Sequence, residues 1–147
     1  MNLGNNANIR MIVKQTADGA TDSSELFTKG EFREHGGSYF IDYDESEATG
    51  YEGSHVQLRI GQEDETITMT RTGRGVFALV FENGKRHFCH YGTEYGDCMI
   101  GISTNELRNG ITGDGGEIYV RYTIDVNSGL MLTNEITIHV KPHGNEI

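Results

Sequence analysis

The chain has 147 residues, which suits one domain that can bury a core without disulfide bonds. Its 22 acidic and 12 basic residues give a net charge of −10, which disfavours nucleic acids and anionic membranes as partners. No run is long enough to span a membrane, and the first residues lack the apolar segment of a secretory signal. With only two cysteines, the chain is predicted to be cytoplasmic and reduced.

Apolar and polar residues alternate with a period of two from Ile9 to Val140, and most runs end at a glycine. This pattern predicts antiparallel strands. Residues 1–7 are predicted to be a disordered tail, 8–141 a single domain and 142–147 a C-terminal tail. The segment 104–109 is expected to form one helical turn at most. The predicted strands are 8–17, 25–34, 38–44, 55–61, 65–72, 76–81, 86–91, 96–104, 117–126 and 130–141.

Asn83-Gly84 is the strongest hairpin signal in the chain. Both residue types tolerate the positive φ that a type I′ turn requires. Such a turn would place Leu79 opposite Phe88.

The Asn-Ser-Gly segment 127–129 predicts a three-residue loop with Gly129 in the left-handed region. This loop pairs Val126 with Leu130 and brings the apolar rows of both strands onto one face. Such agreement between turn and pattern is expected of the correct register.

A series of about eight to ten hairpin-linked strands has two edges that need protection. Closing the sheet on itself removes both edges, so an all-β, closed antiparallel up-and-down barrel is favoured over a sandwich. An eight-stranded barrel has room inside for side chains or one small ligand.

An ordered series of short motifs runs through nearly the whole chain: GSYFIDYDE at 37–45, TG at 49–50, TRTG at 70–73, YGTEYG at 91–96, IST at 102–104 and GEIYVRY at 116–122. It resembles the bacterial YwiB-like family, and this resemblance implies a calycin-like (lipocalin-fold) β-barrel without implying any activity. The chain has no tryptophan and so lacks the Gly-x-Trp start of true lipocalins, whose ligands are therefore not transferred.

Arg71 continues the apolar row of Ile67 and Met69, so its side chain is predicted to point inward. A guanidinium buried without a partner costs several kcal/mol. We expect Arg71 to reach solvent or to pair with Glu45 or a tyrosine hydroxyl. The functional alternative is a bound anionic ligand.

Tyrosines recur along the predicted strands. A tyrosine at the mouth of a barrel combines apolar area with a hydroxyl and suits a small-molecule pocket. It also suits ordinary sheet packing. Tyr43, Tyr91 and Tyr122 are the predicted wall residues if the barrel holds a ligand.

His87 and Cys89 point to the same side of one predicted strand. A turn centred between Thr93 and Glu94 would place Cys98 opposite Cys89. Three ligands without CxxC spacing make a weak zinc signal, so neither a metal nor a cofactor is predicted. A disulfide between the two cysteines is equally disfavoured in a reducing compartment.

Catalytic motifs such as Gly-x-Ser-x-Gly, HExxH or a phosphate loop are missing from the sequence, so no catalytic residue is assigned and enzymatic activity stays open. The first functional hypothesis is a cytoplasmic module that binds a small, anionic molecule near Arg71. A filled core with Arg71 paired to Glu45 would count against it. The alternative is a solid barrel that binds a protein, or a second copy of itself, through its outer surface. Val76–Phe81 is apolar on both faces and is the predicted homodimer contact.

Overall fold

A computed structural model describes residues 6–45, 53–62, 66–73, 76–93, 96–127 and 129–143. These residues form ten strands and no helix. In chain order the strands are β1 Ala7–Ala17, β2 Ala20–His35, β3 Ser38–Asp44, β4 His55–Gly61, β5 Thr66–Thr72, β6 Val76–Glu82, β7 Arg86–Thr93, β8 Gly96–Asn109, β9 Gly116–Val126 and β10 Leu130–Pro142.

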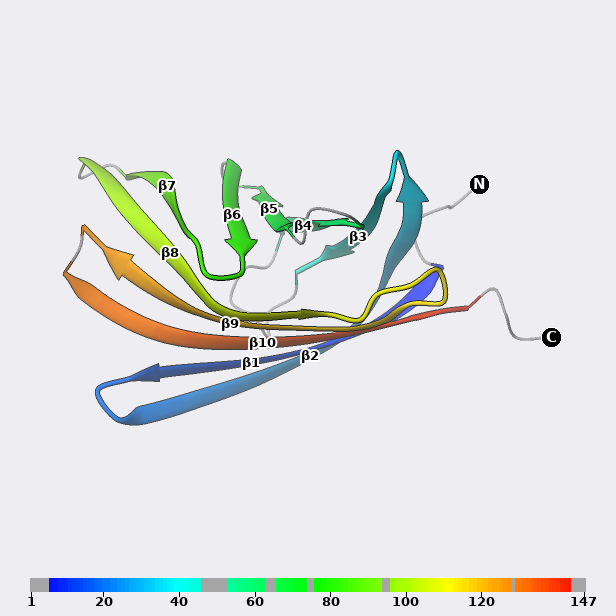
Figure 1. The fold of residues 1–147 in the computed structure, drawn as a ribbon, viewed down its shortest axis with the longest axis horizontal. Coiled ribbons are helices and arrows are strands. Elements are labelled where there is room, and N and C mark those ends of the chain that lie inside the picture. The colour runs from blue at the N-terminus through cyan, green and yellow to red at the C-terminus, as the bar shows by residue number, and fades with distance from the viewer. Residues whose placement is uncertain are drawn as a thin grey trace.

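The ten strands form one sheet in the order β6-β5-β4-β3-β2-β1-β10-β9-β8-β7, and every neighbouring pair is antiparallel. The first and last strands pair with each other, so each half of the barrel is a simple meander. The long strands β1, β2, β8, β9 and β10 curve beneath the shorter strands β3–β6 (Figure 1). The prediction of an all-β antiparallel barrel with eight to ten strands is confirmed.

The barrel is nearly closed at a seam between β6 and β7, which share no ladder. Three hydrogen bonds to Thr104 of β8 bridge the seam. Its Oγ1 accepts from the Glu82 amide (3.2 Å), its carbonyl accepts from Gly84 N–H (3.0 Å), and its own amide donates to the Lys85 carbonyl (3.1 Å). The sheet therefore closes through one residue of β8.

The turn predicted at Asn83-Gly84 is present, because the Lys85 amide donates to the Glu82 carbonyl (2.9 Å), but the predicted type I′ hairpin is wrong, because β6 and β7 share no ladder. Gly84 has a φ of 75°, but Asn83 keeps a negative φ, so the type I′ turn is not formed. Leu79 pairs with Met69, and Phe88 pairs with Gly101. Without the primed turn the two strands splay apart, and the turn backbone bonds to β8.

The predicted register of β9 and β10 is confirmed, because Val126 pairs with Leu130 and the pairing continues in step along both strands. The turn conformation differs from the prediction. Asn127 (φ 50°), and not Gly129, occupies the left-handed region. The Asn127 side-chain oxygen accepts a hydrogen bond from the Met99 amide (3.0 Å). Asparagine tolerates this conformation better than most residues.

The segment 104–109, predicted as a helical turn at most, instead continues β8. The pairing with β9 shifts between Thr104 and Glu106, so Asn105 is the extra residue of a β-bulge. Leu107 then faces inward opposite Val120. The bulge breaks the period-two alternation, which hid this part of the strand in the sequence.

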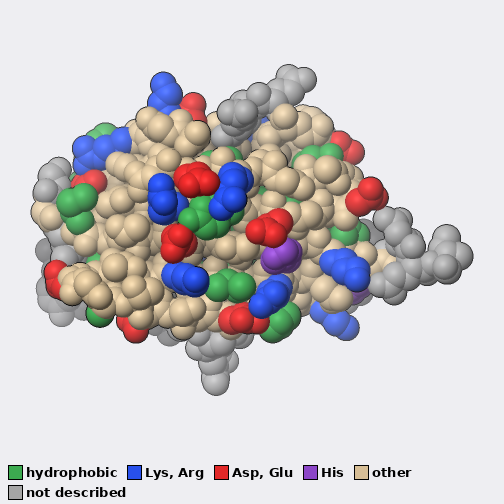
Figure 2. Space-filling view, turned by 60° about the horizontal axis from the view of Figure 1, so that its bottom comes forward, with side chains coloured by type: hydrophobic (Ala, Val, Ile, Leu, Met, Phe, Trp, Pro, Cys, Tyr) green, Lys and Arg blue, Asp and Glu red, His purple; other side chains and the backbone are tan. Residues whose placement is uncertain are grey.

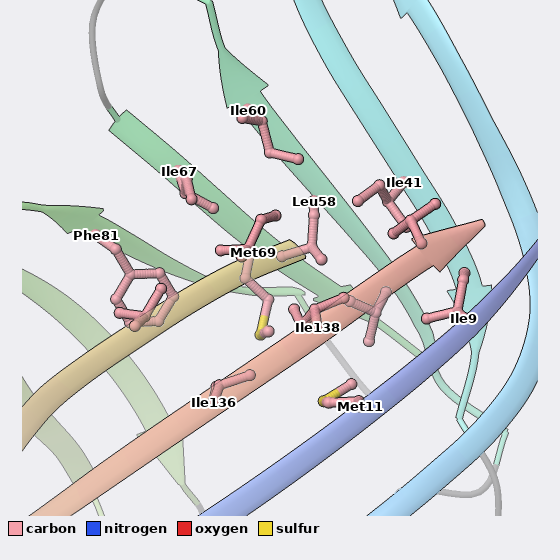
Figure 3. Close-up of a cluster of buried hydrophobic side chains, with 14 of the residues drawn as sticks. Ile9, Met11, Ile41, Leu58, Ile60, Ile67, Met69, Phe81, Ile136 and Ile138 are labelled. Carbon is pink, nitrogen blue, oxygen red and sulfur yellow. The ribbon is translucent and has the colours of Figure 1, made fainter. Parts of the chain in front are cut away.

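The two faces of the barrel wall carry different side chains. Charged side chains of both signs, with isolated apolar ones, cover the outer face formed by β1, β2 and β10 (Figure 2). Large apolar side chains converge inside the barrel (Figure 3). The bulkiest side chains below 2% exposure include Phe81, Ile9, Ile41, Leu58, Ile60, Ile67, Ile102 and Ile118. Protein side chains therefore fill the part of the barrel interior that these residues line.

Candidate functional site

Arg71, near the end of β5, points inward as predicted. Its Nη2 lies 3.1 Å from Glu45 Oε1, and the exposed side-chain fractions are 20% for Arg71 and 1% for Glu45. Across the sheet, Arg71 pairs with Val56, which in turn pairs with Tyr43. Glu45, one of the protein partners expected for Arg71 from the sequence, therefore contacts it.

Tyr43 lies beside this ion pair and is buried. Burial raises the pKa of its phenol well above the usual range; the Glu45 carboxylate and Tyr122 raise it further, and Arg71 partly opposes them. The Tyr43 hydroxyl donates to Met11 Sδ (3.8 Å). The phenol is therefore held in its neutral form.

Tyr122, on β9, is also buried, and its ring packs against Phe81 with 4.7 Å between centroids. The structure thus brings together Tyr43, Glu45, Arg71 and Tyr122, four of the five predicted ligand-binding residues, which we call the inner polar cluster. The side chain of the fifth, Tyr91, lies outside the described residues.

Asn134 is a polar residue beside this cluster that the sequence analysis missed. It is 3% exposed and pairs across the sheet with Tyr122 and Gln15. Its Oδ1 accepts a hydrogen bond from Gln15 Nε2 (3.1 Å), whereas its Nδ2 has no hydrogen-bond partner among the described residues. The signal was present, since Asn134 interrupts the inward apolar row of β10.

The weak metal candidates do not converge within the part of the chain that the structure describes. His87 Nε2 lies 3.0 Å from Glu82 Oε1. Cys89 pairs with Ile100 and not with Cys98, because the β7–β8 ladder pairs Tyr91 with Cys98. Neither cysteine forms a disulfide bond, and no described group of three or more His, Cys, Asp or Glu could hold a metal ion.

The outer face of the long strands carries a groove of about 730 Å³, which we call the outer groove. Two rows of outward side chains border it. One row consists of Lys29, Asn8 and Lys141 on β2, β1 and β10; the other consists of Phe27, Arg10, His139 and Glu117 on β2, β1, β10 and β9.

Charged contacts order one border of the outer groove. Arg10 Nε lies 3.2 Å from Glu25 Oε1, and its guanidinium lies 5.5 Å from the centre of the Phe27 ring. His139 Nε2 lies 3.1 Å from Glu117 Oε2. Phe27 is nevertheless 71% exposed. The groove escaped the sequence analysis because its residues come from four strands that are distant in sequence.

Taken together, the fold and these sites define a small antiparallel β-barrel with a packed interior and a grooved outer face. The chain belongs to the family described as "Domain of unknown function (DUF1934)", whose model matches residues 9–138. This assignment agrees with the resemblance seen in the sequence.

Among solved structures, the ywiB protein from Bacillus subtilis has a similar fold. The TM-score is 0.73, the sequence identity is 16%, and the match covers 95% of this chain and 94% of that one. At this identity the likeness shows the fold alone. No curated protein matches the chain. The described residues include no helix that could cross a membrane.

Proposed function

We propose that the protein is a cytoplasmic interaction module, a solid barrel that binds a protein partner through the outer face of β2, β1, β10 and β9. The outer groove is the observation that carries this proposal. It is bordered by the Phe27 ring, which is 71% exposed and therefore accessible to a partner. Aromatic residues and arginine are also enriched at protein interfaces.

The barrel interior supports the same proposal. Glu45 neutralises the charge of Arg71 inside the protein, so an anion at Arg71 would have to displace an almost fully buried carboxylate. The apolar side chains around the cluster are almost fully buried, so they offer little accessible surface to a ligand. The outer surface is the more accessible place for recognition.

Site-specific photocrosslinking tests this proposal. A photoreactive phenylalanine analogue placed at Phe27 should crosslink the barrel to a discrete partner in cells of its own host. The same analogue at Phe88, a 59% exposed position on β7, is the matched control. A partner captured only from Phe88, or from neither position, would contradict the proposal.

A second candidate function is the binding of a small polar molecule at the inner polar cluster. The unpartnered Nδ2 of Asn134 supports it, because buried donors are nearly always paired with protein, water or ligand. Tyr43, Tyr122 and Arg71 would form the walls of this site. Replacement of Asn134 by leucine should then abolish binding of any molecule that copurifies with the protein.

A homodimer through the outer face of β6 is also proposed from the apolar segment Val76–Phe81. Ala78 is exposed and Val80 is half-buried on this face, whereas the side chains of Val76 and Phe77 lie outside the described residues. Sedimentation velocity over a range of concentrations tests it. A monomer at every concentration would reject the dimer.

A further inference from the structure

We propose that the occupant of the outer groove is an acidic, extended peptide segment of a partner protein, with an apolar side chain between its acidic residues. This inference rests on the proposed interaction function and specifies the chemistry of the partner. Three features carry it: the direction of the groove, the charge of its border and the exposed ring at one end.

The outer groove runs across the strands. Thr28, Ile9 and Val140 lie between the two bordering rows and alternate with the outward residues, so their side chains point to the interior. Backbone alone is left to form the floor between the rows. Four strands spaced about 4.8 Å apart give the floor a length of about 15 Å, which suits four or five residues of an extended chain.

The border is basic, although the whole chain is acidic. Arg10, Lys29 and Lys141 line the groove against Glu117, and Glu25 pairs with Arg10 at the same border, so three bases against two acids give a local net charge of +1 in a chain of −10. Neither Lys29 nor Lys141 forms an ion pair with another described residue. The wider negative charge acts weakly here, because salt screens charges beyond about 8 Å at physiological ionic strength.

Lys29 and Lys141 set the spacing of the acidic residues in the partner. Both pair with Asn8 across the sheet, so their Cα atoms lie about 10 Å apart. Three residues of a chain in the extended polyproline II conformation span about 9 Å and bring side chains i and i+3 to the same side, which predicts acidic residues at positions i and i+3. Glu117 would repel acids at the β9 end and so confine them to β2 and β10, which carry the lysines, and to β1 between them.

Phe27 supplies the apolar contact. Its ring lies on β2 beside Lys29, and the Arg10 guanidinium lies over it. This contact orders the ring while leaving most of it exposed. An apolar side chain between the two acids of the peptide can pack against Phe27.

Titration of the ¹⁵N-labelled full chain with blocked peptides, followed by NMR, tests the inference. The probe is Gly-Glu-Leu-Ser-Glu-Gly, and the controls carry lysine or glutamine in place of both glutamates. We expect the glutamate peptide alone to shift the amides around Asn8, Phe27, Lys29 and Lys141, and added salt should weaken its binding.

Charge reversal identifies the lysines responsible. K29E/K141E should weaken binding of the glutamate peptide at least fivefold. The control K14E/K85E makes the same change in net charge outside the groove and should bind within twofold of the parent chain. Equal effects of the two variants, shifts elsewhere, or no shifts at millimolar peptide would overturn the inference. If crosslinking from Phe27 still captured a partner, the proposed interaction function would survive that failure.

Discussion

At the scale of single residues, the pairing of Arg71 with Glu45 determines what the barrel interior can bind. The carboxylate is more deeply buried than the guanidinium, so the arginine serves first to compensate a charge that water cannot reach. The sequence indicated that Arg71 points inward, but only the fold shows that Glu45 is the expected partner that it contacts.

Replacement of Arg71 by methionine should therefore destabilise the protein. The buried Glu45 carboxylate would lose its counter-charge, and breaking such a pair costs about 3 kcal/mol. Urea unfolding of R71M measures this loss, and R71M/E45Q should recover at least half of it because the stranded charge is gone. An R71M variant as stable as the parent chain would mean that the pair does not form.

Tyr43 gives a pH dependence whose sign follows from its environment. Burial, followed by the Glu45 charge, raises the pKa of its phenol in the folded protein, so folding favours the protonated form. The resulting stability is fully present below the unfolded pKa of about 10 and is lost as the pH rises above it.

In urea unfolding measured from pH 8 to pH 11, the parent chain should lose about 1.4 kcal/mol per pH unit more than Tyr43→Phe above about pH 10. The phenylalanine variant has no proton to lose at this position, which isolates the contribution of Tyr43. Parallel curves for the two proteins would show that Tyr43 is accessible to water.

At the scale of elements, Gly30 lets β2 pair with strands in both halves of the sheet. β2 pairs with β1 along its first part and with β3 along its last residues. A Cβ atom at Gly30 would lie 2.2 Å from the Asp42 carbonyl oxygen and 2.5 Å from Ile9 Cδ1. The close approach of β3 to β2 therefore requires glycine at this position.

Gly30→Ala should lower the free energy of unfolding by about 2–3 kcal/mol through this overlap. Gly113→Ala is the matched control, because a Cβ there meets nothing within 4 Å; it should stay within about 0.5 kcal/mol of the parent chain. Denaturant unfolding of both variants measures the contrast. A harmless G30A would show that β2 and β3 lie further apart than described.

At the scale of the whole molecule, local patterns predicted the strands and the β9–β10 register, whereas features that depend on distant partners were missed. Period-two alternation and the loop at 127–129 act within neighbouring strands. The seam depends on contacts with Thr104, which is distant from the Asn83-Gly84 turn in sequence. The outer groove likewise combines Phe27 with Lys141. No local pattern contains that information.

The seam also predicts an uneven distribution of protection. β1 pairs on both sides, whereas β6 pairs through a ladder with β5 alone. In hydrogen exchange followed by mass spectrometry, segments of β6 should exchange well before those of β1. Equal protection would show that a second copy or another chain covers the edge of β6.

Native mass spectrometry of protein purified gently from its own host tests most directly whether the barrel is solid. A solid barrel that binds through its outer surface predicts the mass of the bare chain, or of the chain with a protein partner. A reproducible small-molecule surplus, lost on denaturation and absent from Asn134→Leu, would contradict this account and would place recognition at the inner polar cluster.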